Sequence, residues 1–261
     1  MDSPNKFYRL ANQYLETLLK ETCKVFSVDR FDIEIEQVTE QLSTPGFSGG
    51  IMAYSFFKTR KLTFFPLEFI KLYPYIKRKN SKFLNGYSLN DYVISNLSHE
   101  VSHKAHDVKT NFELGNQTKK LSSGYFKNPE SKAIYTYCIG VADGVADFAM
   151  NVILKRLGLD KLADANRKCS KYDIEGGMEK NKNIEPQDIP DALKEMSFDE
   201  SKNLAFLLIE HYQQKFEKEG LEGFRRFVME WRPSQVSYYD ATSLMIELFR
   251  QQQLRMFSKG I

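Results

Sequence analysis

The chain has 261 residues, of which 42% are hydrophobic and 27% are charged, so it can form a sizeable core and is not expected to be disordered. Its 37 basic and 34 acidic residues leave a net charge of only +3, which argues against the positive field of a nucleic-acid-binding protein. Three cysteines at wide spacing do not form a disulfide framework. The N-terminus lacks the apolar core of a signal peptide, and no segment approaches the roughly 20 apolar residues of a membrane span. We therefore expect a reduced, cytoplasmic protein that binds neither nucleic acid nor a membrane.

The first elements alternate between helix and strand patterns. Residues 7–26 repeat apolar side chains at helical spacing, which predicts an opening amphipathic helix. Residues 31–38 largely alternate apolar and polar side chains and predict a strand, and residues 50–57 and 62–65 predict a hairpin around the polar turn 58–61. A short helix over 67–76 precedes a helix over 92–108, whose N-terminal cap should lie among residues 88–91.

Beyond residue 124 the sequence is predominantly helical in pattern. Helices are predicted over residues 130–157, 159–169, 199–218, 221–231 and 242–257. The polar segment 173–191 contains two glycines and two prolines and predicts a long surface loop. This order predicts an α+β, zincin-like fold, in which a small, mostly antiparallel sheet packs on helices and an all-helical C-terminal lobe follows. We expect one compact unit, with residues 1–125 in the first lobe and residues 126–261 in the second.

The segment from His99 to His103 reads His-Glu-Val-Ser-His and carries the clearest chemistry. Residues four apart lie on one face of a helix, so the two imidazoles can bind one zinc ion. Zinc would lower the pKa of a bound water towards about 7, and Glu100, as the general base, would take its proton during attack on a carbonyl. The chain has only four histidines, so this spacing is improbable by chance, although a coincidental pair facing solvent is the alternative.

A catalytic zinc also needs a third protein ligand. His106 is a poor candidate because three ligands from one straight helix cannot easily surround a metal. Asp143 and Asp147 are four apart in an apolar helical stretch, where carboxylates are costly unless paired or metal-bound. We predict that Asp143 is the third ligand and that Asp147 orients a ligand histidine. The alternative is a pair of acids that face water or bond Lys and Arg side chains. The small residues at 140, 142, 144 and 146 should let this helix approach the histidine helix closely.

These two motifs resemble the gluzincin group of zinc metallopeptidases over about residues 31–150. In that group the second helix carries a Glu ligand and, commonly, an Asp four residues later, and these positions match Asp143 and Asp147. Asp serves as third ligand in the aspzincin group. The metzincin pattern does not fit, because it has Gly and His where this chain has His106 and Lys109. The resemblance implies a peptidase whose extended substrate lies along the outer strand of the hairpin within residues 50–65.

A donor for the oxyanion of the tetrahedral intermediate is less clearly indicated. His211 is one candidate, and Tyr238 and Tyr239 are others, in a predicted loop after Pro233. His106 is a further possible cleft residue. Each of these residues also has an ordinary structural interpretation, as a partly exposed helix histidine or a packing tyrosine.

The sequence therefore predicts a zinc metallopeptidase that acts on a peptide or protein substrate. One alternative is a binding or regulatory protein that keeps a zincin scaffold without activity. Another is a peptidase held inactive by its own chain, with segment 173–191 or the C-terminal tail 255–261 in the cleft.

Overall fold

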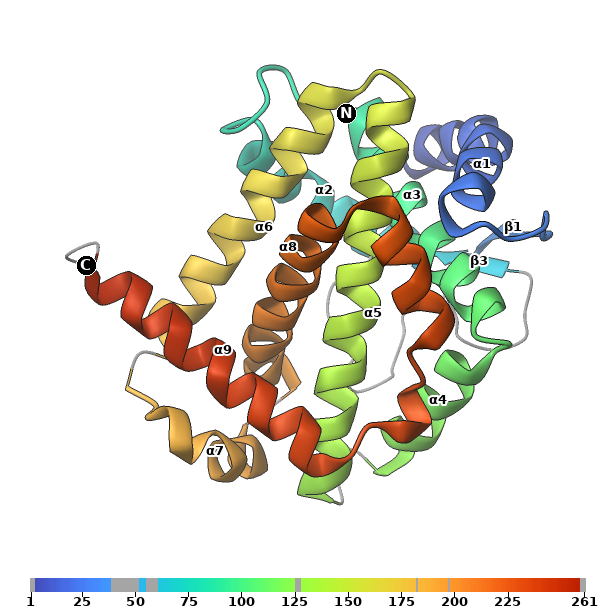
Figure 1. The fold of residues 1–261 in the computed structure, drawn as a ribbon. Coiled ribbons are helices and arrows are strands. Elements are labelled where there is room, and N and C mark those ends of the chain that lie inside the picture. The colour runs from blue at the N-terminus through green and yellow to red at the C-terminus, as the bar shows by residue number, and fades with distance from the viewer. Residues whose placement is uncertain are drawn as a thin grey trace.

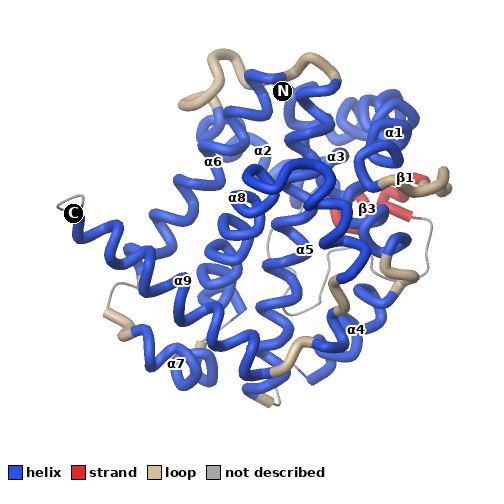
Figure 2. The backbone as a smooth tube through the Cα atoms, in the orientation of Figure 1, coloured by secondary structure: helices blue, strands red, loops and turns tan. Residues whose placement is uncertain are grey.

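The computed structural model describes residues 3–38, 52–54, 61–124, 128–181, 183–196 and 198–258. Of these residues, 81% are helical, so the predicted α+β class is wrong and the fold is mainly helical (Figures 1 and 2). The helices are α1 (Pro4–Phe26), α2 (Pro66–Asn80), α3 (Leu89–Lys109), α4 (Glu113–Gly124), α5 (Pro129–Arg156), α6 (Asp160–Lys180), α7 (Ile189–Glu195), α8 (Phe198–Glu230) and α9 (Tyr238–Ser258). Two short 3₁₀ turns, η1 (Pro186–Asp188) and η2 (Pro233–Gln235), precede α7 and α9.

The described strands form a small sheet in the order β1-β3-β2, with bounds Glu34–Gln37, Lys61–Phe64 and Met52–Tyr54. β1 runs parallel to β3, and β2 runs antiparallel to β3. The expectation of a mostly antiparallel sheet is therefore also wrong, because alternation identifies a strand but does not fix its neighbour or its direction. Residues 55–60, which include most of the predicted hairpin turn, lie outside the described residues.

The sheet is attached to the helices through aromatic side chains. Phe7 of α1 stacks on Phe64 of β3 with ring centroids 4.5 Å apart, and it lies 5.1 Å from Phe69 of α2 and 5.8 Å from Tyr92 of α3. All four rings are almost completely buried. This cluster fixes the sheet against the N-terminal part of α3, the helix that carries the two histidines.

α3 begins where the sequence predicts. Ser88 precedes the helix and forms a capping box with Asp91: the Ser88 amide donates to the carboxylate at 2.8 Å, and the Asp91 amide donates to the Ser88 hydroxyl at 3.2 Å. Such a cap satisfies amide groups that the first turn of a helix leaves without partners. The predicted cap region is therefore confirmed.

α5 is the central helix and packs against α3 on one side and α8 on another (Figure 1). Gly140 and Gly144 lie on the α8 side: an added Cβ would come within 2.7 Å of Leu208 Cβ or 3.0 Å of Tyr212 Cβ, respectively. The prediction that the small residues bring α5 close to the histidine helix is therefore wrong for Gly140 and Gly144, which face α8.

The expectation that no segment approaches a membrane span is corrected by α5, which is long and apolar enough to cross a membrane, judged by length and composition only. However, 72% of its most apolar window is buried inside the protein, as in the core helix of a soluble fold, so this property is weak evidence about a membrane.

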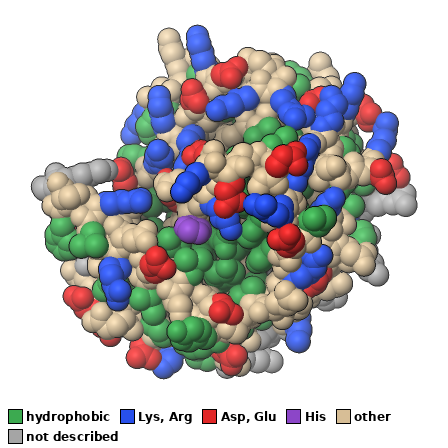
Figure 3. All heavy atoms as spheres, in the orientation of Figure 1, with side chains coloured by type: hydrophobic (Ala, Val, Ile, Leu, Met, Phe, Trp, Pro, Cys, Tyr) green, Lys and Arg blue, Asp and Glu red, His purple; other side chains and the backbone are tan. Residues whose placement is uncertain are grey.

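The face in Figure 3 intermixes basic and acidic side chains, in keeping with the small net charge.

The C-terminal half contains the largest error of the secondary-structure prediction. Most of the predicted loop 173–191 is helical, because α6 continues to Lys180 and α7 begins at Ile189. Ile174 and Met178 are buried, and a Cβ on Gly177 would lie 2.8 Å from Asn203 Oδ1 of α8. The glycine therefore serves close helix packing rather than a turn. In α8, by contrast, Gly220 has φ of 70° and separates two helical segments, which confirms the predicted break.

Candidate metal centre

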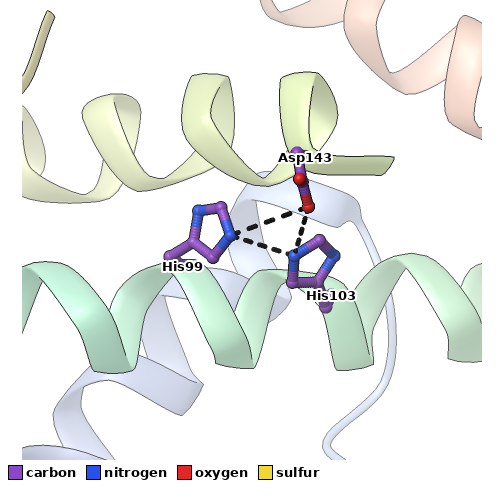
Figure 4. Close-up of side chains that lie close together, drawn as sticks. All are labelled: His99, His103 and Asp143. Carbon is purple, nitrogen blue, oxygen red and sulfur yellow. Dashed lines mark hydrogen bonds and ion pairs between the residues drawn. The ribbon is translucent and has the colours of Figure 1, made fainter. Parts of the chain in front are cut away.

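Three side chains from two helices converge on one point (Figure 4). His99 Nε2 and His103 Nε2 of α3 lie 3.0 Å apart, and Asp143 Oδ1 of α5 lies 3.2 Å from His103 Nε2 and 4.0 Å from His99 Nε2. The two histidines meet because they are one helical turn apart, and Asp143 meets them because α5 packs on α3. The structure thus brings together the three residues that the sequence singles out as ligands.

These separations suit a single metal ion. Zinc bonds of about 2.0–2.2 Å in tetrahedral geometry place neighbouring ligand atoms roughly 3.3 Å apart. The three observed separations, 3.0, 3.2 and 4.0 Å, bracket that value. Two imidazole nitrogens and a carboxylate oxygen are moreover a donor set that zinc commonly uses.

One side of the cluster is open to solvent. The His103 side chain is only 7% exposed, whereas the side chains of His99 and Asp143 are 23% and 32% exposed. A site of this kind can take a further ligand from solution, which a fully enclosed structural site cannot.

Asp147 fixes the orientation of His99. Its Oδ1 lies 2.8 Å from His99 Nδ1, and its Oδ2 accepts a hydrogen bond of 2.7 Å from Gln213 Nε2 of α8. Because the carboxylate accepts a hydrogen bond from Nδ1–H, Nε2 of His99 is left to face His103 and Asp143. This is the carboxylate–histidine pairing that orients metal-binding imidazoles.

The charges around His99 favour a cation. Burial lowers the pKa of His99, but the hydrogen bond and charge of Asp147, with the charges of Glu100 and Asp143, outweigh it and raise the pKa to about 9. Three carboxylates thus stabilise positive charge at this position. Glu100 is half-buried and adjacent to the first histidine in the chain, as the motif requires.

The remaining predicted site residues lie elsewhere. His106 is completely buried against Trp231, with ring centroids 5.5 Å apart, and burial, together with the charge of His103, lowers its pKa to about 3. His211 lines a small cavity with residues of α9 such as Leu248. It lies two positions before Gln213, the residue of α8 that contacts Asp147, and therefore on a different face of α8. Tyr239 lies in the first turn of α9 rather than in the predicted loop, and it is 76% exposed. Tyr238, also in the first turn of α9, packs partly buried against the core.

Two residues near the cluster were not anticipated. Gln213 is 1% exposed and lies between Asp147 and Arg167 of α6, which donates to the Gln213 side-chain oxygen. The available signal was an amide at helical spacing between Glu210 and Glu217 of α8, but the identity of its partners depends on how three helices pack.

No protein-family model, curated protein or solved structure matches this chain. The resemblance to gluzincins rests on the two motifs alone. Function must therefore be inferred from the site itself.

Proposed function

We propose that this protein is a zinc-dependent hydrolase that cleaves peptide bonds. The observation that carries the proposal is that two imidazole nitrogens of α3, the helix that also bears Glu100, and one carboxylate oxygen of α5 converge within 4.8 Å of one another. A zinc ion bound there would lower the pKa of a water molecule towards about 7 and polarise a carbonyl oxygen.

The side chains have distinct roles in this proposal. His99, His103 and Asp143 hold the ion, and Asp147 keeps His99 in the tautomer that leaves Nε2 available. Glu100 accepts a proton from the attacking water and passes it to the leaving amine, as a general base and then a general acid. The use of Asp143 where gluzincins have Glu is compatible with the direct packing of α5 on α3.

A non-enzymatic protein with a structural zinc is the competing interpretation. A structural site is closed by a fourth protein ligand. Among the described residues the cluster contains three, and its solvent-exposed side includes Asp143. These two features favour the catalytic proposal.

Replacing Glu100 by Gln separates metal binding from catalysis. We expect the Glu100→Gln variant to retain zinc and to hydrolyse a reduced, alkylated protein at least about 100-fold more slowly, since it lacks the general base. A matched control is Glu68→Gln in α2, another partly buried glutamate, which pairs with Lys71 and should leave the rate unchanged. Undiminished hydrolysis by Glu100→Gln, with zinc bound, would refute the proposed activity.

A further inference from the structure

We propose that Gln213 and Arg167 are positioning residues of the metal centre. They hold Asp147, and through it the ring of His99, although neither residue belongs to the ligand cluster. This inference rests on the proposed function, because it assigns a role to residues that act on the same site. It makes the affinity for zinc depend on α8 and α6 as well as on the two helices that supply the ligands.

The orientation of the Gln213 amide is determined by its two neighbours. The Asp147 carboxylate can only accept hydrogen bonds and the Arg167 guanidinium can only donate them. The Gln213 Nε2 must therefore face Asp147, and its Oε1 must face Arg167, as observed. A reversed amide would place its oxygen against the Asp147 carboxylate and its NH2 group against the Arg167 guanidinium. Because Gln213 is only 1% exposed, water could not supply the missing hydrogen bonds.

Arg167 is held as firmly as the amide. Its Nη1 donates to Glu210 Oε2 at 2.6 Å, its Nη2 to Glu210 Oε1 at 3.2 Å, and its Nε to Glu217 Oε1 at 2.9 Å. The two-point contact with Glu210 is the geometry in which a guanidinium is most strongly directed. Arg167 thus offers Gln213 a fixed donor.

A continuous series of hydrogen bonds links Arg167 to His99. Arg167 fixes Gln213, Gln213 fixes Oδ2 of Asp147, and Oδ1 of Asp147 bonds His99 Nδ1. The hydrogen bond from Gln213 restricts rotation of the Asp147 carboxylate, so Oδ1 stays in line with the imidazole. Loss of groups that orient metal ligands typically weakens metal binding about 10–100-fold. Because Gln213 acts one bond further away, we expect a value near the lower end.

Two neighbouring residues of α8 provide a matched comparison. Gln213→Leu removes a buried hydrogen bond between α8 and α5 at Asp147. Tyr212→Phe removes another buried hydrogen bond between the same helices, the 2.7 Å contact of Tyr212 with Tyr137, and leaves Asp147 untouched. Arg167→Met is a second test, at a side chain that is 14% exposed, whereas Gln213 is 1% exposed.

The experiment measures zinc affinity by competition with a chelator, and the visible absorption of the cobalt-substituted protein, for the wild type and all three variants. We expect about tenfold weaker zinc binding and an altered cobalt spectrum in Gln213→Leu, a smaller change of the same kind in Arg167→Met, and wild-type values in Tyr212→Phe. A merely structural role would lower the stability of Gln213→Leu and Tyr212→Phe alike, without changing the cobalt spectrum.

The outcomes separate this inference from the proposed function. If the wild type binds zinc and both the Gln213→Leu and Arg167→Met variants keep its affinity and cobalt spectrum, the positioning role is refuted while the metal centre stands. If Gln213→Leu does not fold, the Arg167→Met result decides in the same way. If the wild type itself binds no zinc, the metal centre fails and the positioning role fails with it.

Discussion

At His99 the two ring nitrogens have different partners, and this division determines what the residue can do. Nδ1 bonds Asp147, and Nε2 faces His103 and Asp143. An imidazole held in this way presents its Nε2 in a fixed direction. The spacing of His99 and His103 predicted a shared face, and the spacing of Asp143 and Asp147 predicted a second one. Both are regular consequences of the helix and need no tertiary information.

His106 differs in its surroundings from the other two histidines of α3. The sequence indicated it as a possible cleft residue, yet its ring is completely buried beside Trp231. Neither ring nitrogen has a hydrogen-bond partner among the described residues. This environment disfavours a charged imidazole, which is why its pKa falls to about 3.

The buried His106 predicts an acid-sensitive contribution to stability. An unfolded chain protonates this histidine below a pKa of about 6.5, whereas the folded chain keeps it neutral down to about 3. Above about pH 6.5 His106 is neutral in both states and does not lower the free energy of unfolding. As the pH falls from about 6.5 towards 3, the unfolded chain binds a proton that the folded chain does not, and the free energy of unfolding decreases. Between pH 7.5 and 5.5 we expect metal-stripped wild type to lose about 1.4 kcal/mol more unfolding free energy than His106→Phe, measured by urea denaturation.

The comparison with His106→Phe cancels the titration of groups that do not interact with His106, such as His99; His103, whose charge acts on His106, is the exception. A Phe ring has similar size and no proton to take up. Equal losses in the two proteins would show that His106 is already solvated or charged in the folded state.

Among the helices, those with a strong apolar period or a clear cap were the ones that the sequence predicted well. α3 has its capping box, and the two segments of α8 are separated by Gly220. The helical nature of residues 173–180 was missed because two glycines and several charges mask the buried side chains of Ile174 and Met178. α4 is likewise predominantly polar, and no element was predicted over its residues from the sequence.

The close contact of α5 with α8 is the packing feature most sensitive to mutation. A Cβ on Gly140 would lie 2.7 Å from Leu208 Cβ and 3.1 Å from the Ala205 carbonyl oxygen, so the two helices must separate to admit it. We expect Gly140→Ala to lower the unfolding free energy by about 1–3 kcal/mol, measured by urea denaturation.

Gly176 of α6 supplies the control for this prediction. It is exposed, and nothing lies within 4 Å of its would-be Cβ. Gly176→Ala should therefore raise the unfolding free energy by about 0.5–1 kcal/mol through helix propensity alone. If Gly140→Ala also proved stabilising, the tight α5–α8 contact would be incorrect.

At the scale of the whole molecule, the site depends on four helices that are distant in sequence. α3 and α5 carry the three residues of the candidate metal cluster, and α8 and α6 carry Gln213 and Arg167. The sequence indicated the ligands because periodicity relates residues within one helix. It did not indicate Gln213 or Arg167, because nothing local relates residue 147 to residues 213 and 167. The direction of strand β1 relative to β3 was missed for the same reason.

The single hydrophobic core extends through both predicted lobes, from Phe7 to Phe249. The relation between α3 and α5 is therefore set by packing throughout the molecule. A zinc ion bound by ligands from both helices would link them further, because a ligand that binds only the folded state stabilises it.

Calorimetric titration of the metal-stripped protein with zinc at pH 7.5 tests the central claim most directly. We predict one ion bound per chain, and binding weakened by more than about 100-fold in Asp143→Ala, since loss of a direct ligand should exceed loss of an orienting group. Absence of zinc binding by the wild type, or unchanged affinity in Asp143→Ala, would contradict the assignment of His99, His103 and Asp143 as a metal centre.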